Sequence, residues 1–225
     1  PAFYLARVRR IAPALWVMCS CVLVAGAAWL MPSEFARLAV HARDSLLFIS
    51  NLSYTKEAGY FDGAANTKWL LHTWSLAVEW QFYLILPWFF IVLRRLGLPR
   101  RGQILIYAAL ALALLVLCTL RTPLQPTRYF YGLDARAWEL LAGGLVLFAG
   151  ERLRTEGAKR LSELAGLALI LASAALASPR LYWPGAWALG PVVGAALLLL
   201  ANRRSRLTGN ALAQWLGYRS YSLYL

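Results

Sequence analysis

The stretch from Leu71 to Tyr83 places a histidine, a serine and a carboxylate at helical spacing beside an apolar run. His72, Ser75, Glu79 and Tyr83 are three or four residues apart, and at ~100° per residue such positions share one helix face. An imidazole can act as a general base near neutral pH, and a nearby hydroxyl can share its proton path. The spacing therefore predicts a polar stripe with His72, Ser75 and Glu79 as candidate catalytic residues.

Glu79 is the most unusual member of this stripe, because the same segment continues into apolar residues suited to lipid, 84–93. An ionisable side chain in such a segment is costly and indicates a functional site. His72 also has a simpler interpretation, as part of an interfacial aromatic belt with Trp69 and Trp74. Its position alone leaves both interpretations open.

The composition indicates which solvent surrounds these segments. Hydrophobic residues make up 60% of the chain, charged residues only 15%, and the mean hydropathy is +0.56, whereas soluble domains carry about 25% charged residues. We therefore expect an all-α fold, a polytopic transmembrane helical bundle whose partner is the lipid bilayer. A helix needs ~20 apolar residues to cross it. The sequence gives about seven candidate spans: 11–31, 69–93, 103–120, 132–150, 161–178, 186–201 and 211–225.

These spans predict a single integral-membrane domain over residues 1–225. The chain starts at Pro1 without an initiator Met and stops at Leu225 inside an apolar segment. We therefore expect it to be an interior fragment, truncated at both ends. The segment 32–68 is the longest predicted connection, and His41 is expected to be partly exposed within it.

The positive charge of the chain follows the predicted topology. The net charge is +13 at pH 7, with 23 Lys and Arg against 10 Asp and Glu. Cationic residues accumulate in cytoplasmic loops, which predicts a multi-pass protein of the cell membrane with Arg7–Arg10 on the cytoplasmic side. Because basic residues alternate with spans instead of forming one soluble face, we expect no nucleic-acid partner. The basic residues concentrate in four alternate segments: 1–10, 94–101, 151–163 and 202–206.

Arg7, Arg9 and Arg10 form a cluster before the first predicted span, with Pro13 expected in the first turn of that span. Guanidinium groups are planar, permanently charged and bidentate, so they suit a phosphate-bearing cytosolic donor such as a nucleotide or coenzyme A. The alternative is that they fix topology and contact anionic lipid headgroups.

A second polar pair, Arg136 and Glu139, lies at the start of the predicted span 132–150. Residues three apart can form an ion pair along a helix. That pair is either a salt bridge at the membrane surface or part of a site. We expect no metal site, because His41 and His72 are not grouped with other ligands.

Taken together, four motifs resemble those of the acyltransferase family 3 membrane proteins, over essentially the whole chain. The family includes bacterial O-antigen, peptidoglycan and exopolysaccharide O-acetyltransferases. The most specific motif is His-Thr-Trp-Ser-Leu-x-x-Glu-x-x-Phe-Tyr, residues 72–83. The matching segments are Phe3 to Leu15, Leu71 to Tyr83, Arg136 to Gly143 and Leu216 to Leu225.

The resemblance implies transfer of an acyl group, usually acetyl, from cytoplasmic acyl-CoA to a hydroxyl of a glycan, cell-envelope or small-molecule acceptor. It implies that the arginine cluster holds the coenzyme A phosphates, and that Glu79 and its neighbours shape the acceptor side or a proton path. Further family motif positions are Trp74, Tyr83, Arg136, Glu139, Ser220 and Tyr221.

The resemblance also implies a catalytic histidine on a span upstream of Pro1, so we expect the 225-residue piece to be inactive alone. A transporter or flippase for a glycan or anionic substrate is the competing interpretation, since intramembrane charges also suit a translocation path. A structural membrane subunit is a third. The acceptor, the acyl chain length, any fused soluble domain and the oligomeric state remain open.

Overall fold

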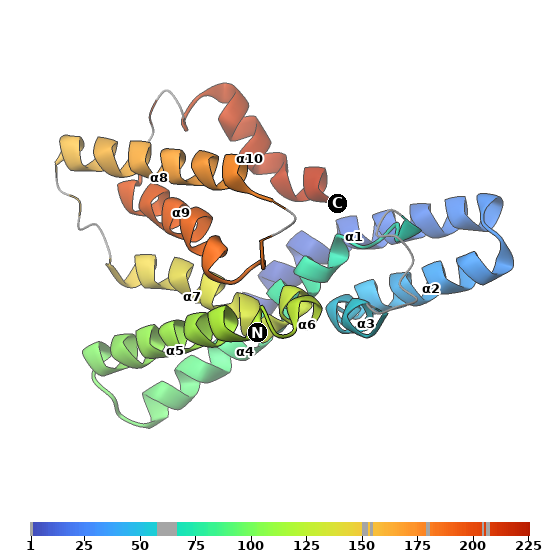
Figure 1. The fold of residues 1–225 in the computed structure, drawn as a ribbon, viewed down its shortest axis with the longest axis horizontal. Coiled ribbons are helices and arrows are strands. Elements are labelled where there is room, and N and C mark those ends of the chain that lie inside the picture. Colours follow the sequence, from blue (N-terminus) through green and yellow to red (C-terminus); the bar gives the residue numbers. More distant parts are fainter. Residues whose placement is uncertain are drawn as a thin grey trace. The chain divides into compact units, whose positions relative to one another are not determined.

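The computed structural model describes residues 2–57, 67–149, 153, 155–178, 181–203, 205 and 208–225. These residues form helices joined by turns and short connections, without a strand among them, which confirms the all-α prediction (Figure 1). The helices are α1 (Ala2–Trp29), α2 (Pro32–Leu46), α3 (Ser50–Glu57), α4 (Thr73–Arg95), α5 (Arg100–Arg121), α6 (Pro126–Tyr131), α7 (Leu133–Ala149), α8 (Glu156–Leu176), the 3₁₀ turn η2 (Ala186–Ala188), α9 (Leu189–Ala201) and α10 (Ala211–Tyr224).

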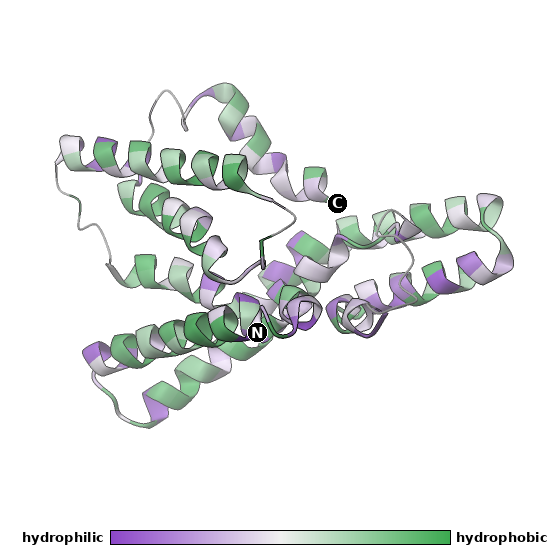
Figure 2. Cartoon of the chain, viewed as in Figure 1, coloured by the Kyte–Doolittle hydropathy of each residue, from purple (hydrophilic) through white to green (hydrophobic). Residues whose placement is uncertain are grey.

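Three of these helices, α1, α4 and α5, are long and apolar enough to cross a membrane by length and composition. Hydrophobic residues, green in Figure 2, make up most of these helices, as expected of helices that face lipid. The other four predicted spans are also helical, but they are shorter or carry more charge. Their crossing of the membrane stays a prediction.

The beginning of α1 differs from the sequence-based expectation. The helix starts at Ala2 instead of residue 11, so the arginine cluster is part of the helix itself. Pro13 consequently lies inside α1 and not in its first turn, so that prediction is wrong. A proline inside a helix removes one backbone hydrogen bond, a loss that membrane helices tolerate when neighbouring groups compensate.

Two further helices, α2 and α3, lie within the segment predicted to be a long connection. The start of α2 has a recognisable signal, because Pro32 occupies the first turn and the Glu34 carboxylate accepts a hydrogen bond of 3.2 Å from the Met31 N–H. His41 lies on α2 and is only 7% exposed, which corrects the expectation of a partly exposed position. Its Nε2 is 2.7 Å from Oε1 of Glu57.

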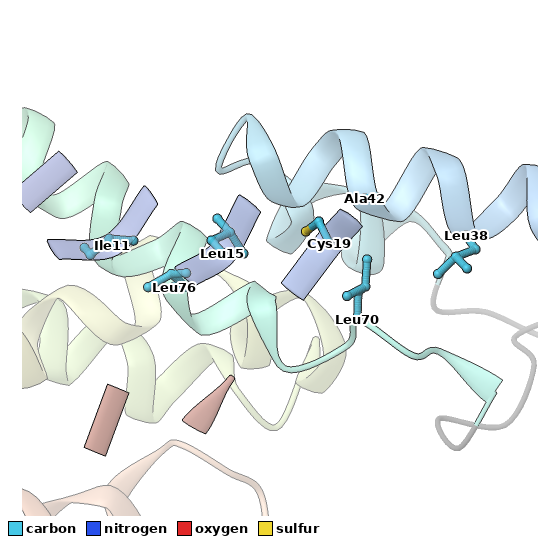
Figure 3. Close-up of a cluster of buried hydrophobic side chains, with 7 residues drawn as sticks. All are labelled: Ile11, Leu15, Cys19, Leu38, Ala42, Leu70 and Leu76. Atoms are coloured by element: carbon cyan, nitrogen blue, oxygen red, sulfur yellow. The ribbon is translucent and has the colours of Figure 1, made fainter. Parts of the chain in front are cut away.

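The chain divides into two compact units. Unit 1 comprises 1–91, 131–133 and 219–225, and unit 2 comprises 92–130 and 134–218. In unit 1, α1 and α2 pack against each other. Figure 3 shows the buried side chains that α1, α2, the first turns of α4 and the turn before α4 contribute to this core. This core consists of Ile11, Leu15, Cys19, Leu38, Ala42, Leu70 and Leu76.

In unit 2, α8 and α9 form the most extensively packed helix pair. Gly166 and Gly194 make this close approach possible. A Cβ placed at Gly166 would lie 2.7 Å from the Gly194 carbonyl oxygen, and one at Gly194 would lie 2.8 Å from the Gly166 carbonyl oxygen. Small residues at such crossings let helix backbones approach closely.

Candidate functional site

The candidate site in unit 1 is a cavity of about 550 Å³ between α1, α4 and the last turns of α10. That volume lies within the usual range for small-molecule sites, roughly 300–1,000 Å³. Its polar lining combines guanidinium, carboxylate and hydroxyl groups that come from opposite ends of the chain. These residues are Arg7, Arg10, Ser75, Glu79, Tyr83, Ser220, Tyr221 and Tyr224.

The α4 wall of the cavity confirms most of the polar stripe that the spacing predicts. Ser75, Glu79 and Tyr83 are four residues apart on α4, and all three line the cavity. The Tyr83 hydroxyl donates a hydrogen bond to Oε1 of Glu79. A carboxylate that leaves water needs such a donor, because an unpaired buried charge is strongly disfavoured.

His72 is the exception to this stripe, because α4 begins at Thr73 and His72 lies in the turn before it. It is not among the residues that line the cavity. Its ring meets the ring of Tyr224 edge to face, with 5.8 Å between centroids, and its buried Nε2 has no hydrogen-bond partner in the described part of the chain. Burial lowers the pKa of His72, and a hydrogen bond with the Leu225 backbone opposes that shift. The imidazole is therefore predominantly neutral at pH 7.

The α1 wall carries two of the three predicted arginines. Arg7 and Arg10 are three residues apart, share one helix face and line the cavity. Arg9 is exposed and is not part of the lining. Two residues along a helix correspond to a rotation of ~200°, which takes Arg9 away from the face of Arg7.

Aromatic rings hold the Arg7 guanidinium at the cavity wall. Its central carbon lies 3.7 Å from the centroid of the Phe3 ring and 5.1 Å from that of Tyr83. The Nε atom of Arg7 is buried and has no hydrogen-bond partner among the described residues. A cationic donor left without an acceptor beside a cavity is suited to an anionic ligand.

The α10 wall contributes the predicted Ser220 and Tyr221, and also Tyr224. The Tyr221 hydroxyl donates to the Ile11 carbonyl of α1 at 2.7 Å. The Tyr224 hydroxyl is bonded to Ser75 Oγ and also contacts the His72 carbonyl at 2.5 Å. Sequence reasoning missed Tyr224, although its three-residue spacing from Tyr221 places both on one helix face.

These contacts change how Ser75 and His72 are related. The Ser75 hydroxyl lies 3.4 Å from the His72 backbone carbonyl, and Tyr224 bridges the two residues. The structure therefore links them through a backbone carbonyl and a phenol, and within the described part of the chain no hydrogen bond joins Ser75 to the imidazole. Trp74, the remaining motif residue of this turn, packs edge to face on Tyr131 at 5.3 Å.

Arg136 and Glu139 lie in unit 2, where the predicted ion pair along α7 is confirmed. Arg136 Nη1 is 3.1 Å from Oε1 of Glu139, and the two side chains are 14% and 22% exposed. The Arg136 guanidinium also lies 5.3 Å from the Phe130 ring centroid. Together with Gly143 and residues of α9, the pair lines a smaller cavity of about 240 Å³.

The described part of the chain contains no cluster of three His, Cys, Asp or Glu that could hold a metal ion. The arrangement in unit 1 is suited to a different chemistry. The Arg7 and Arg10 side chains can hold a phosphate-bearing ligand. Glu79 and the hydroxyl groups near it, which line the same cavity, can bind or move a proton.

Helices of membrane-spanning length and a cationic, hydroxyl-rich cavity between helices define an all-α membrane protein with a polar cavity. A family model described as an acyltransferase domain matches residues 1–225. The chain belongs to this acyltransferase family.

Curated relatives agree with this assignment. The peptidoglycan O-acetyltransferase OatA of Listeria monocytogenes is 31% identical over 242 residues, which cover 99% of this chain and 38% of the relative. A protein of Komagataeibacter xylinus named BcsY is 29% identical over 225 residues, 99% of this chain and 57% of its own length. The chain thus spans less than two thirds of these relatives. No solved structure matches the chain.

Proposed function

We propose that the full-length protein is a membrane O-acyltransferase. It transfers an acyl group, most simply acetyl, from acyl-CoA to a hydroxyl of a glycan or small molecule of the cell envelope or secreted material. The observation that carries this proposal is the presence of Arg7, Arg10 and Glu79 on the walls of one cavity. Family membership and a relative named as a peptidoglycan O-acetyltransferase support it.

The arginines form the donor side of this proposal. Coenzyme A carries phosphate groups, and guanidinium groups bind phosphate through short, charge-assisted hydrogen bonds. Arg7 and Arg10 line the cavity from one helix face, and the buried Nε of Arg7 has no hydrogen-bond partner among the described residues. The positive-inside rule predicts that this end of α1 faces the cytoplasm, where acyl-CoA is available.

Glu79 forms the polar centre of the reaction in this proposal. The acceptor oxygen forms a bond to the thioester carbonyl carbon, the carbon–sulfur bond breaks, and the hydroxyl proton must finally reach the coenzyme A sulfur. Glu79 is a carboxylate on the cavity wall that can hold that proton on its way. His72 lies outside the lining, so it would act on the cavity through Tyr224 and Ser75.

The donor test compares arginine variants of the purified full-length protein. Each of Arg7→Ala and Arg10→Ala is expected to raise the Kd for coenzyme A about 10- to 100-fold. A lost hydrogen bond to a charged group costs about 1.5–3 kcal/mol, and 1.4 kcal/mol corresponds to a factor of ten in Kd. Equilibrium binding of radiolabelled coenzyme A provides the measurement.

Arg9→Ala is the matched control, because it removes the same charge from the same helix at an exposed position outside the cavity. We expect its Kd to stay within about twofold of the original. An equal rise in Kd for all three substitutions would show that the arginines act only through general electrostatics or topology. Glycan or anion movement across the membrane without coenzyme A consumption would favour the transporter alternative instead.

A further inference from the structure

Tyr83 occupies the point in the cavity wall where the cationic side and the carboxylate meet. Its hydroxyl donates to Glu79 one helical turn earlier on α4. Its ring lies 5.1 Å from the Arg7 guanidinium carbon and 6.1 Å from the Phe3 ring centroid. One side chain therefore contacts both groups on which the proposed function depends.

The hydroxyl contact matters because Glu79 lies in an apolar helix. Among the residues that the structure describes, no Lys, Arg or His forms an ion pair with the Glu79 carboxylate. The hydrogen bond from Tyr83 therefore orients one of its oxygens directly. A carboxylate that works on a proton must be held at a defined position, because small displacements reduce proton-transfer rates.

The ring contact matters for Arg7. The guanidinium contacts two aromatic rings that meet edge to face, with its central carbon 3.7 Å from the Phe3 centroid and 5.1 Å from the Tyr83 centroid. Cation–π contacts of this kind stabilise a guanidinium and restrict its orientation without using its N–H donors. The donors stay available for a ligand, which agrees with the buried Nε that has no partner.

We propose that Tyr83 is a positioning residue with two separable functions. Its hydroxyl orients Glu79 for proton handling, and its ring keeps Arg7 oriented toward the phosphate-bearing donor. This inference rests on the proposed function, and it adds that donor binding and chemistry are coupled through one tyrosine.

Two substitutions separate the two functions. Tyr83→Phe keeps the ring and removes the hydroxyl, so we expect kcat for acetyl transfer to fall about tenfold while the Kd for coenzyme A stays within about twofold. Tyr83→Leu removes both, so we expect the same fall in kcat together with a Kd raised about three- to tenfold. Full-length enzyme is assayed in membranes with radiolabelled acetyl-CoA, and label in the glycan fraction is counted.

Tyr4→Phe is the matched control. Tyr4 is also partly buried in unit 1 and donates to the Leu84 carbonyl of α4 at 3.2 Å, but it is not among the residues lining the cavity. We expect its kcat and Kd to equal those of the unsubstituted protein. A comparable loss in Tyr4→Phe would show that any missing phenol in this region is damaging and would overturn the specific role of Tyr83.

A double-mutant cycle keeps the test decisive if a single variant is less stable. In the Glu79→Gln background, Tyr83→Phe should produce little further loss of kcat, because the charged partner of the hydroxyl is already gone. Additive losses, or an unchanged kcat in Tyr83→Phe alone, would overturn the proposal. Failure of the proposed function is distinguishable, because the unsubstituted protein would then not bind coenzyme A.

Discussion

At the residue scale, the candidate site depends on which face of its helix each polar side chain occupies. The arginine cluster illustrates this, since Arg7 and Arg10 line the cavity and Arg9 does not. Composition alone treats the three as equivalent, and only the start of α1 at Ala2 fixes their separate faces. The Ser75, Glu79 and Tyr83 stripe was predictable because all three lie within one regular helix.

Glu79 is the residue whose replacement should be most damaging to catalysis. We expect Glu79→Gln to lower kcat for acetyl transfer about 100-fold or more, because the amide keeps the shape but can no longer hold a proton. The Kd for coenzyme A should change little, since the arginines are untouched. Transfer of label from acetyl-CoA by membranes carrying the full-length protein provides the measurement.

Two results would contradict that prediction. Unchanged transfer in Glu79→Gln would remove the carboxylate from the mechanism. A strongly raised Kd with an unchanged kcat would assign Glu79 to donor binding instead. Glu34→Gln is a suitable control, because this exposed carboxylate caps α2 and is not among the residues lining the cavity.

His72 and Tyr224 show where prediction from sequence ended. The helical spacing predicted that His72 belongs to the α4 stripe, yet α4 begins one residue later. Tyr224 reaches His72 from 152 residues away in the chain, and no local pattern encodes such a tertiary contact.

At the element scale, strongly apolar segments were predictable and short amphipathic ones were not. The spans found by hydropathy all correspond to helices. By contrast, α2 and α3 contain polar residues that are buried, including His41, Asp44 and Asn51, so their composition resembles that of a connection. Their polar groups bond one another: the Ser53 hydroxyl donates to Asp44 at 2.5 Å.

The packing of α8 on α9 leads to a prediction at this scale. Gly166→Ala should destabilise the protein by about 1–3 kcal/mol, the usual range for overpacking, because the new methyl group would meet the Gly194 carbonyl at 2.7 Å. Backbone cannot move aside as a flexible side chain can. Thermal unfolding in detergent measures the change, and the loss of the monodisperse peak is its signal.

Gly157→Ala provides the comparison within the same helix. No atom lies within 4 Å of a Cβ at Gly157, so the only expected effect is the better helix propensity of alanine. A melting temperature equal to or above that of the original is expected for Gly157→Ala. Equal destabilisation by both substitutions would show that the glycine contact is not the cause.

At the scale of the whole molecule, the distribution of charge predicts which ends of the spans face the cytoplasm. The turn between α4 and α5 is flanked by Arg94, Arg95, Arg100 and Arg101, and hydrophilic residues mark these helix ends in Figure 2. Such concentrations indicate the cytoplasmic side. The same rule predicts that the opposite end of α5 faces the outer side.

Thiol labelling can test that orientation. Leu96 and Leu124, 65% and 70% exposed, lie beyond opposite ends of α5. In a background with Cys21 replaced by serine, a membrane-impermeant maleimide should label Leu124→Cys in intact cells. Leu96→Cys should react only after permeabilisation. The reverse pattern would invert the proposed topology and separate Arg7 from cytosolic acyl-CoA.

The hydrogen bond from Tyr221 to Ile11 joins segments 210 residues apart in the chain. It closes a cavity whose other walls come from α1 and α4. During synthesis, α1 and α4 leave the ribosome long before α10 does, and contacts of such sequence separation form late. The nascent chain must therefore pass through membrane insertion with this cavity still open on one side. Under the proposed function, the order of biosynthesis keeps the donor from binding in a finished cavity until α10 has been made and has packed against α1.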